Sequence, residues 1–87
     1  MATDPRTYTV TGLLIKATER AVLVEVHYID TTKMEPFVKE WFPKTQVTEM
    51  IITSEDDRIE AEIAGDEIPL DEFTIKHWIL SEKGLVK

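Results

Sequence analysis

The sequence predicts a mainly β protein: a small, partly closed antiparallel barrel of the OB-like or SH3-like type, with five or six strands and one short C-terminal helix. Three observations support this prediction. Apolar and polar residues alternate in several short segments, turn-forming residues separate those segments, and the period becomes helical only near the C-terminus. A chain of 87 residues builds one core, so we expect residues 1–87 to form a single domain.

The first two strands are expected over residues 8–17 and 21–29. In the first, Gly12 interrupts a run of β-branched and apolar residues, which indicates a bend or bulge. The second strand shows the most regular alternation in the chain. Its predicted inward face consists of Val22, Val24, Val26 and Tyr28, with Glu25 and His27 on the opposite face.

A hairpin loop over residues 30–36 and a third strand over residues 37–42 are expected next. Pro43 cannot donate a backbone hydrogen bond, so it either ends this strand or places it at a sheet edge. The two faces of the strand consist of Val38 with Phe42, and of Phe37 with Lys39 and Trp41.

Two further strands are expected over residues 47–53 and 58–64, separated by a polar turn. The inward face of the second consists of Ile59, Ala61 and Ile63, and its outward face of Glu60 and Glu62. Near the C-terminus, Thr74 is expected to cap a short helix that has Lys83 in its last turn and Gly84 directly after it.

Negative charge is concentrated in residues 55–72, which hold nine of the seventeen acidic residues and a single base, Arg58. The remaining residues carry eight acids and nine bases and are close to neutral. This segment is either a solvated surface or one uniformly negative edge of the barrel, which would mimic a row of phosphates and attract a basic groove. The expected partner-binding residues are Glu55, Asp56, Asp57, Glu60, Glu62, Asp66, Glu67, Asp71 and Glu72.

Candidate catalytic groups are few. The chain has no cysteine, which excludes disulfides, thiolate nucleophiles and cysteine zinc sites. We expect His27 on the outer face of a strand and His77 on a helix surface, without a partner for acid–base catalysis. Residues 55–57 lack the ligand spacing of a calcium loop, and no nucleophile elbow or phosphate loop is present. We therefore expect no enzymatic activity, no cofactor and no metal.

The segment around Trp41 allows two interpretations. In the first, Trp41 and Trp78 both pack into the domain, as most aromatic side chains do in a small protein. In the second, Trp41 is an exposed platform on which bases of single-stranded nucleic acid stack. The nucleic-acid-binding residues under this alternative are Lys39, Trp41, Lys44 and Gln46.

Two short motifs carry a resemblance. Residues 40–47 read Glu-Trp-Phe-Pro-Lys-Thr-Gln-Val, and residues 77–85 read His-Trp-Ile-Leu-Ser-Glu-Lys-Gly-Leu. Together they resemble small uncharacterised proteins encoded by bacteriophages and prophages. The resemblance implies a phage origin and supplies no activity.

The resulting functional prediction is a non-enzymatic, phage-type acidic interaction module. Its expected partner is the basic surface of a nucleic-acid-handling protein, such as a CRISPR or restriction nuclease of host defence, which it would inhibit as a DNA mimic. The alternatives are a single-stranded DNA-binding accessory of phage replication or recombination, and a structural part of a virion; the oligomeric state stays open. Residues 1–8 contain no apolar run and no segment is long enough to span a membrane, so we expect a cytoplasmic protein in the bacterial host.

Overall fold

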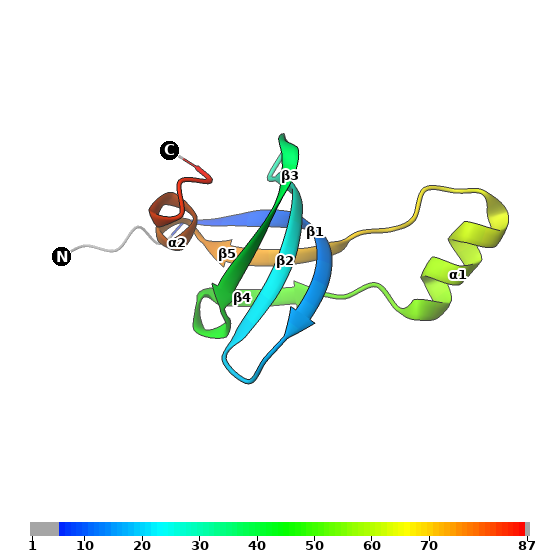
Figure 1. The fold of residues 1–87 in the computed structure, drawn as a ribbon, viewed down its shortest axis with the longest axis horizontal. Helices are drawn as coiled ribbons and strands as arrows, with labels where there is room; N and C mark the ends of the chain where they lie inside the picture. Colours follow the sequence, from blue (N-terminus) through cyan, green and yellow to red (C-terminus); the bar gives the residue numbers. More distant parts are fainter. Residues whose placement is uncertain (1–5, 87) are drawn as a thin grey trace.

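The computed structural model describes residues 6–86, which form one antiparallel sheet and two short α-helices (Figure 1). The strands are β1 (Thr7–Ala17), β2 (Ala21–Ile29), β3 (Thr32–Pro43), β4 (Val47–Ile51) and β5 (Asp71–Lys76). The helices are α1 (Glu55–Ala64) and α2 (His77–Glu82), with a 3-10 turn η1 (Lys44–Gln46) between β3 and β4. The first five residues of the stretch in which we expect no signal peptide lie outside the described residues.

The strand order is β3-β2-β1-β5-β4, and every neighbouring pair is antiparallel. Consecutive strands pair within β1-β2-β3 and within β4-β5, and the pairing of β1 with β5 joins these two parts into one sheet. The sheet is not closed, because its two edge strands β3 and β4 do not pair with each other; η1 connects them along the chain. The predicted mainly β fold with antiparallel strands and a short C-terminal helix is confirmed.

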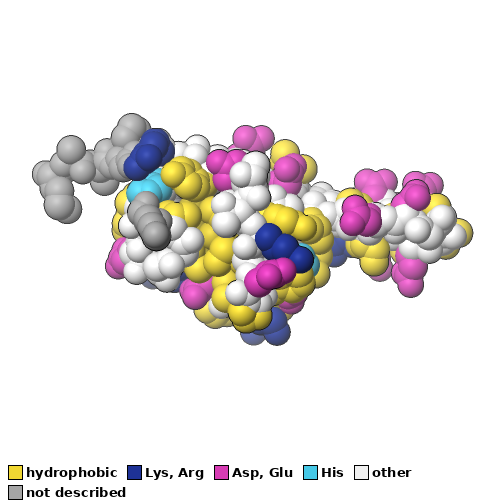
Figure 2. Space-filling view, turned by 90° about the horizontal axis from the view of Figure 1, so that it is seen from above, with side chains coloured by type: hydrophobic (Ala, Val, Ile, Leu, Met, Phe, Trp, Pro, Cys, Tyr) yellow, Lys and Arg dark blue, Asp and Glu magenta, His cyan; other side chains and the backbone are white. Residues whose placement is uncertain are grey.

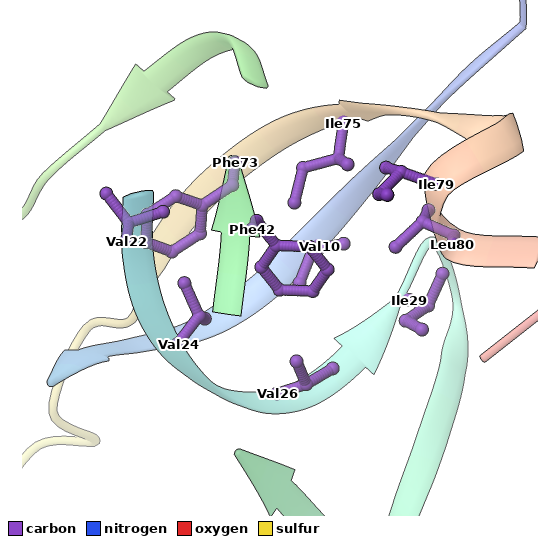
Figure 3. Packing of buried hydrophobic residues seen from close by; sticks show 10 residues of the cluster. All are labelled: Val10, Val22, Val24, Val26, Ile29, Phe42, Phe73, Ile75, Ile79 and Leu80. Atoms are coloured by element: carbon purple, nitrogen blue, oxygen red, sulfur yellow. The ribbon is translucent and has the colours of Figure 1, made fainter. Parts of the chain in front are cut away.

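The core lies inside the curve of the sheet, as Figure 3 shows. The predicted alternation in β2 is confirmed for its valines, and Phe42 is fully buried while Phe37 and Trp41 of the same strand are exposed. Helix α2 covers one end of this core with two of its apolar side chains. The buried apolar residues are Val10, Val22, Val24, Val26, Ile29, Phe42, Phe73, Ile75, Ile79 and Leu80.

The predicted irregularity at Gly12 is confirmed, because the register between β1 and β2 shifts between Thr11 and Gly12. Gly12 is buried, and a Cβ atom at this position would overlap the carbonyl oxygen of Glu25 on β2. The partner strand is irregular as well, since Thr11 pairs with Tyr28 and Gly12 with Val26. This register places Tyr28 on the exposed side of the sheet, not on the inward face predicted for it.

The predicted strand over residues 58–64 is wrong, because these residues belong to α1. The Ser54 hydroxyl caps the helix by accepting a hydrogen bond from the Asp57 backbone N–H at 3.2 Å. Three acidic residues occupy the first turn, where they interact favourably with the positive end of the helix dipole. Gly65 then ends the helix in the left-handed conformation, at φ 74°.

The fifth strand of the sheet is instead β5, and Thr74 lies within it and caps no helix. Phe73 and Ile75 alternate inward along β5, and helix α2 begins at His77. The predicted termination at Gly84 is confirmed: Gly84 has φ 75°, and its N–H donates to the Ser81 carbonyl while that of Leu85 donates to the Leu80 carbonyl. Lys83 caps the helix after Glu82 and does not lie in its last turn as predicted. The hairpin after β2 is tighter than predicted, with β3 beginning at Thr32. Among residues 6–86, no helix is long and apolar enough to cross a membrane.

Candidate interaction surface

Residues 52–70, which we call the acidic arm, connect β4 to β5 and carry α1 away from the sheet (Figure 1). The arm leaves and re-enters the sheet at adjacent positions, because Ile51 at the end of β4 pairs with Glu72 near the start of β5. The described residues extend over 50 Å along their longest axis and only 19 Å along the shortest. The arm is therefore the most protruding feature of the fold.

Most of the predicted partner-binding residues lie on this arm and are exposed. Eight of the nine acidic residues in the predicted segment are exposed to solvent. The arm itself carries seven acids and one arginine, which gives it a net charge of minus six. Figure 2 shows these acidic side chains on opposite edges of the arm, with apolar side chains between them. The exposed members of the predicted set are Glu55, Asp56, Asp57, Glu60, Glu62, Asp66, Glu67 and Glu72.

The acidic residues do not form the strand edge that the sequence suggests. Glu60 and Glu62 lie on a helix, where successive residues are about 100° apart, so their side chains point to different sides of it. A helix spreads negative charge around a rod. The surface that results is a protruding acidic rod and not a straight row of carboxylates along a barrel edge.

Asp71, the ninth predicted partner-binding residue, is completely buried. Its Oδ2 accepts a hydrogen bond from the Leu14 backbone N–H at 2.9 Å, and its Oδ1 accepts one from the Thr53 backbone N–H at 2.8 Å. The Arg58 guanidinium donates a third, from Nη2 to Oδ1 at 2.7 Å. Asp71 therefore joins β1, the start of the arm and helix α1, and it does not reach the surface.

Arg58 is the only base in the arm, and its charge is paired with the buried Asp71 carboxylate. Its side chain is 33% exposed, and its Nε is buried without a hydrogen-bond partner among residues 6–86. A charge-assisted hydrogen bond to a buried carboxylate is among the stronger polar contacts in proteins. This ion pair tethers α1 to the sheet and partly neutralises the one positive charge of the arm, whose other charged side chains are acidic and exposed.

Helix α1 also presents apolar side chains. None of its residues is buried, and Ile63 is 82% exposed. Ile59 lies one helical turn before Ile63 on the same side of the helix, and it is exposed as well. The sequence pattern that suggested a strand placed both isoleucines in the core. The structure places them in solvent.

A hollow of about 540 Å³ lies where the returning part of the arm meets the outer face of the sheet. Glu67, Glu72 and Tyr28 line it, together with Thr11 and His27 of the sheet and apolar residues of the arm. Carboxylates and an aromatic ring are groups that bind a lysine or arginine side chain. Neither the hollow nor the role of Tyr28 follows from the sequence pattern, which placed Tyr28 in the core.

The residues of the alternative nucleic-acid site are only partly brought together. Trp41 is 41% exposed on the outer face of β3, on the same face as the exposed Lys39. Lys44 is exposed in η1. Gln46 is used internally, because its Oε1 accepts a hydrogen bond from the Trp78 indole N–H at 2.9 Å. The prediction that both tryptophans pack is therefore incorrect for Trp41, while Trp78 is partly buried against the core.

The outer face of β2 and β3 holds further aromatic side chains that were not assigned to a site. Phe37 is exposed and stacks on the His27 ring at 3.8 Å between centroids. The His27 Nε2 also lies 3.0 Å from a Glu25 carboxylate oxygen. Glu25 is paired with Lys39 across the β2–β3 ladder. Phe37, Lys39 and Trp41 are two residues apart along β3, and this spacing in the sequence indicated that they share one face of the strand.

The remaining candidates for chemistry do not form a site. His77, predicted on a helix surface, is buried and its ring lies 5.3 Å from that of Tyr8. Within residues 6–86 no three His, Cys, Asp or Glu residues are grouped so that they could hold a metal ion. Near the start of β3, the Glu35 carboxylate accepts a hydrogen bond from the exposed Lys33 and raises the pKa of the lysine.

No protein-family model matches the chain, and searches of curated proteins and of solved structures find no match. The resemblance of residues 40–47 and 77–85 to phage-encoded proteins stays a prediction.

Proposed function

We propose that the protein is a non-enzymatic interaction module that uses its acidic arm to bind the basic surface of a nucleic-acid-handling protein. In a phage setting, such a partner is a host defence nuclease of the CRISPR or restriction type, and the module acts as an inhibitor that occupies its nucleic-acid groove. The module works in the cytoplasm of the bacterial host.

The observation that carries this proposal is the segregation of charge in space. Seven carboxylates lie on a protruding arm whose single cation is paired with buried Asp71, while the rest of the chain is close to neutral. A protruding segment of one charge sign fits into a groove of the opposite sign. Such a contact associates rapidly at low salt and weakens as salt rises.

The test is a capture experiment with the wild-type chain as bait in lysate of a bacterial host, at low and moderate salt, with and without nuclease. The proposal expects a basic protein that is retained without nucleic acid and released as salt rises. A variant with Glu60→Gln, Glu62→Gln, Asp66→Asn and Glu67→Gln loses this protein.

The matched control also removes four negative charges, but from exposed positions outside the arm. Its substitutions are Glu19→Gln, Asp30→Asn, Glu49→Gln and Glu82→Gln. It keeps binding if the arm is the interaction surface. Equal loss in both variants would mean that net charge alone matters, and unchanged binding in the arm variant would contradict the proposal.

The outer face of the sheet supports a second candidate, a single-stranded DNA-binding accessory. Its supporting observation is the exposure of Phe37 and Trp41 on the face that also carries Lys39, because aromatic platforms beside cations bind unpaired bases. An oligothymidine titration at low salt then quenches tryptophan fluorescence, and Trp41→Ala removes the quenching while Trp78→Phe keeps it. An unchanged fluorescence signal rejects this candidate.

A further inference from the structure

Helix α1 is too short to be stable alone, and apart from the Arg58–Asp71 ion pair little of it is shielded by the rest of the described chain. A helix of ten residues is marginal in water, and helices in proteins depend on an apolar face that packs against something. α1 has its capping serine and its terminal glycine, yet none of its residues is buried. Its apolar side is without a partner in the described part of the chain.

That apolar side is a narrow ridge between carboxylates. One turn of an α-helix takes about 3.6 residues, so Ile59 and Ile63 lie on one side of α1. Around the helix, Glu55 and Glu62 lie to one side of this ridge and Asp56 and Glu60 to the other. Figure 2 shows that the arm exposes both acidic and apolar side chains.

The tether at the base of the arm fixes which way the ridge faces. Arg58 lies on a different side of α1 from the two isoleucines and reaches back to Asp71 at 2.7 Å. Ala61, near Arg58 on the helix circumference, is partly shielded, whereas Ile59 and Ile63 are exposed. The ion pair therefore turns the ridge away from the protein's own sheet and toward solvent.

We propose that α1 docks as an amphipathic helix into an apolar groove of the partner protein, with Ile59 and Ile63 as anchors and with lysine or arginine side chains of the partner along both rims of the groove. This inference rests on the proposed function and specifies the chemistry of the partner site. Helix-in-groove recognition uses anchors at this one-turn spacing, and the flanking carboxylates select a groove whose rims are basic.

A second copy of this chain is a poorer occupant of the ridge. Each copy carries a net charge of minus seven, and two arms placed ridge to ridge bring their carboxylates together. The charge pattern thus favours a partner of opposite sign over self-association.

The test uses the protein that the capture experiment retains, identified by mass spectrometry and purified, and measures its affinity by isothermal titration at physiological ionic strength. The variants Ile59→Gln and Ile63→Gln remove the anchors without adding charge, and glutamine is the better helix former, so α1 keeps its helical content. The control is Ile15→Gln, an isoleucine of β1 that is 46% exposed and lies outside the arm.

We expect each anchor variant to raise the Kd by about tenfold or more, and the control variant to keep the Kd within about twofold of the wild-type value. The result separates the two proposals. If the charge variant of the arm weakens binding and both anchor variants do not, the groove inference is wrong and the acidic interaction module stands.

If neither kind of variant changes the Kd, both proposals are wrong, and the same holds if the wild-type chain retains no salt-sensitive protein. Analytical ultracentrifugation of the wild-type chain alone tests whether a second copy of the chain occupies the ridge. A dimer that dissociates in the Ile63→Gln variant identifies a second copy on the ridge and overturns the inference.

Discussion

Replacing Asp71 by asparagine removes one negative charge from the buried junction between the sheet and the arm. The carboxylate accepts three hydrogen bonds through its two oxygens. The asparagine side chain has only one oxygen that can accept these bonds, and its NH2 group, itself a donor, then faces a donor of the protein. At least one of these contacts is lost, and Arg58 loses the charge that balances it.

The expected cost follows from these contacts. Breaking a buried ion pair by removing one partner costs about 3–5 kcal/mol, and a hydrogen bond to a charged group contributes about 1.5–3 kcal/mol. Because Arg58 is one-third exposed, water solvates part of its charge after the substitution. We therefore expect the free energy of unfolding to fall by about 3 kcal/mol, at the lower end of this range. For a domain of this size, this loss lowers the Tm by roughly 12–24 °C.

The assay is urea unfolding followed by tryptophan fluorescence, with Glu72→Gln as the control. Glu72 is the next residue of the same strand, undergoes the same chemical change, and is exposed. Its replacement is expected to change the free energy of unfolding by less than about 0.5 kcal/mol. Equal effects of Asp71→Asn and Glu72→Gln on that free energy would refute the assignment of Asp71 as the junction.

Three further predictions concern the core, the helix cap and the close approach of two strands. Phe42→Ala costs about 3–5 kcal/mol in urea unfolding, whereas Phe37→Ala, five residues earlier on the exposed face of β3, costs less than about 1 kcal/mol. Ser54→Ala destabilises α1 by roughly 1 kcal/mol. Because none of the residues of α1 is buried, this change appears as faster hydrogen exchange in the helix while the urea midpoint stays unchanged, and a shifted midpoint would contradict it. Gly12→Ala lowers the urea midpoint by more than any surface substitution, since its Cβ atom overlaps the Glu25 carbonyl, and a wild-type midpoint would show that the two strands separate easily.

The sheet core was predictable because its signal is strong and local. Val22, Val24 and Val26 alternate without interruption and are all buried, as the period of two predicts. Gly12 in a run of β-branched and apolar residues indicated the bulge that the register shift confirms. In these segments the local preference and the tertiary structure agree.

Helix α1 was missed because two periods coincide in its sequence. Ile59 and Ile63 are four residues apart, which places them on one face of a strand and equally on one face of a helix. The caps distinguish the two cases: Ser54 before three acidic residues marks a helix start, and Gly65 marks its end. Giving these caps more weight than the alternation would have predicted the helix.

Two predictions at the site were wrong, and both concern Asp71 and the strand that it begins. Thr74 was expected to cap a helix, whereas it lies in β5, which begins at the inward-facing Asp71. Its burial also could not be deduced from a cluster of nine acids, because its partners Leu14 and Thr53 are brought to it only by the fold. Long-range hydrogen bonds of this kind leave no local trace in a sequence.

The attachment of the arm has a consequence for how such a protein can change. Its two ends emerge from the paired positions Ile51 and Glu72, so the sheet supplies a fixed gap that an inserted segment has only to bridge. The entropic cost of a longer flexible insertion rises slowly, by about 0.6 kcal/mol for each doubling of length. Provided that Asp71 keeps its donors, a segment of different length and charge can replace α1 while the core stays intact. The same sheet can therefore carry arms suited to different partners, and specificity can diverge while the fold is conserved.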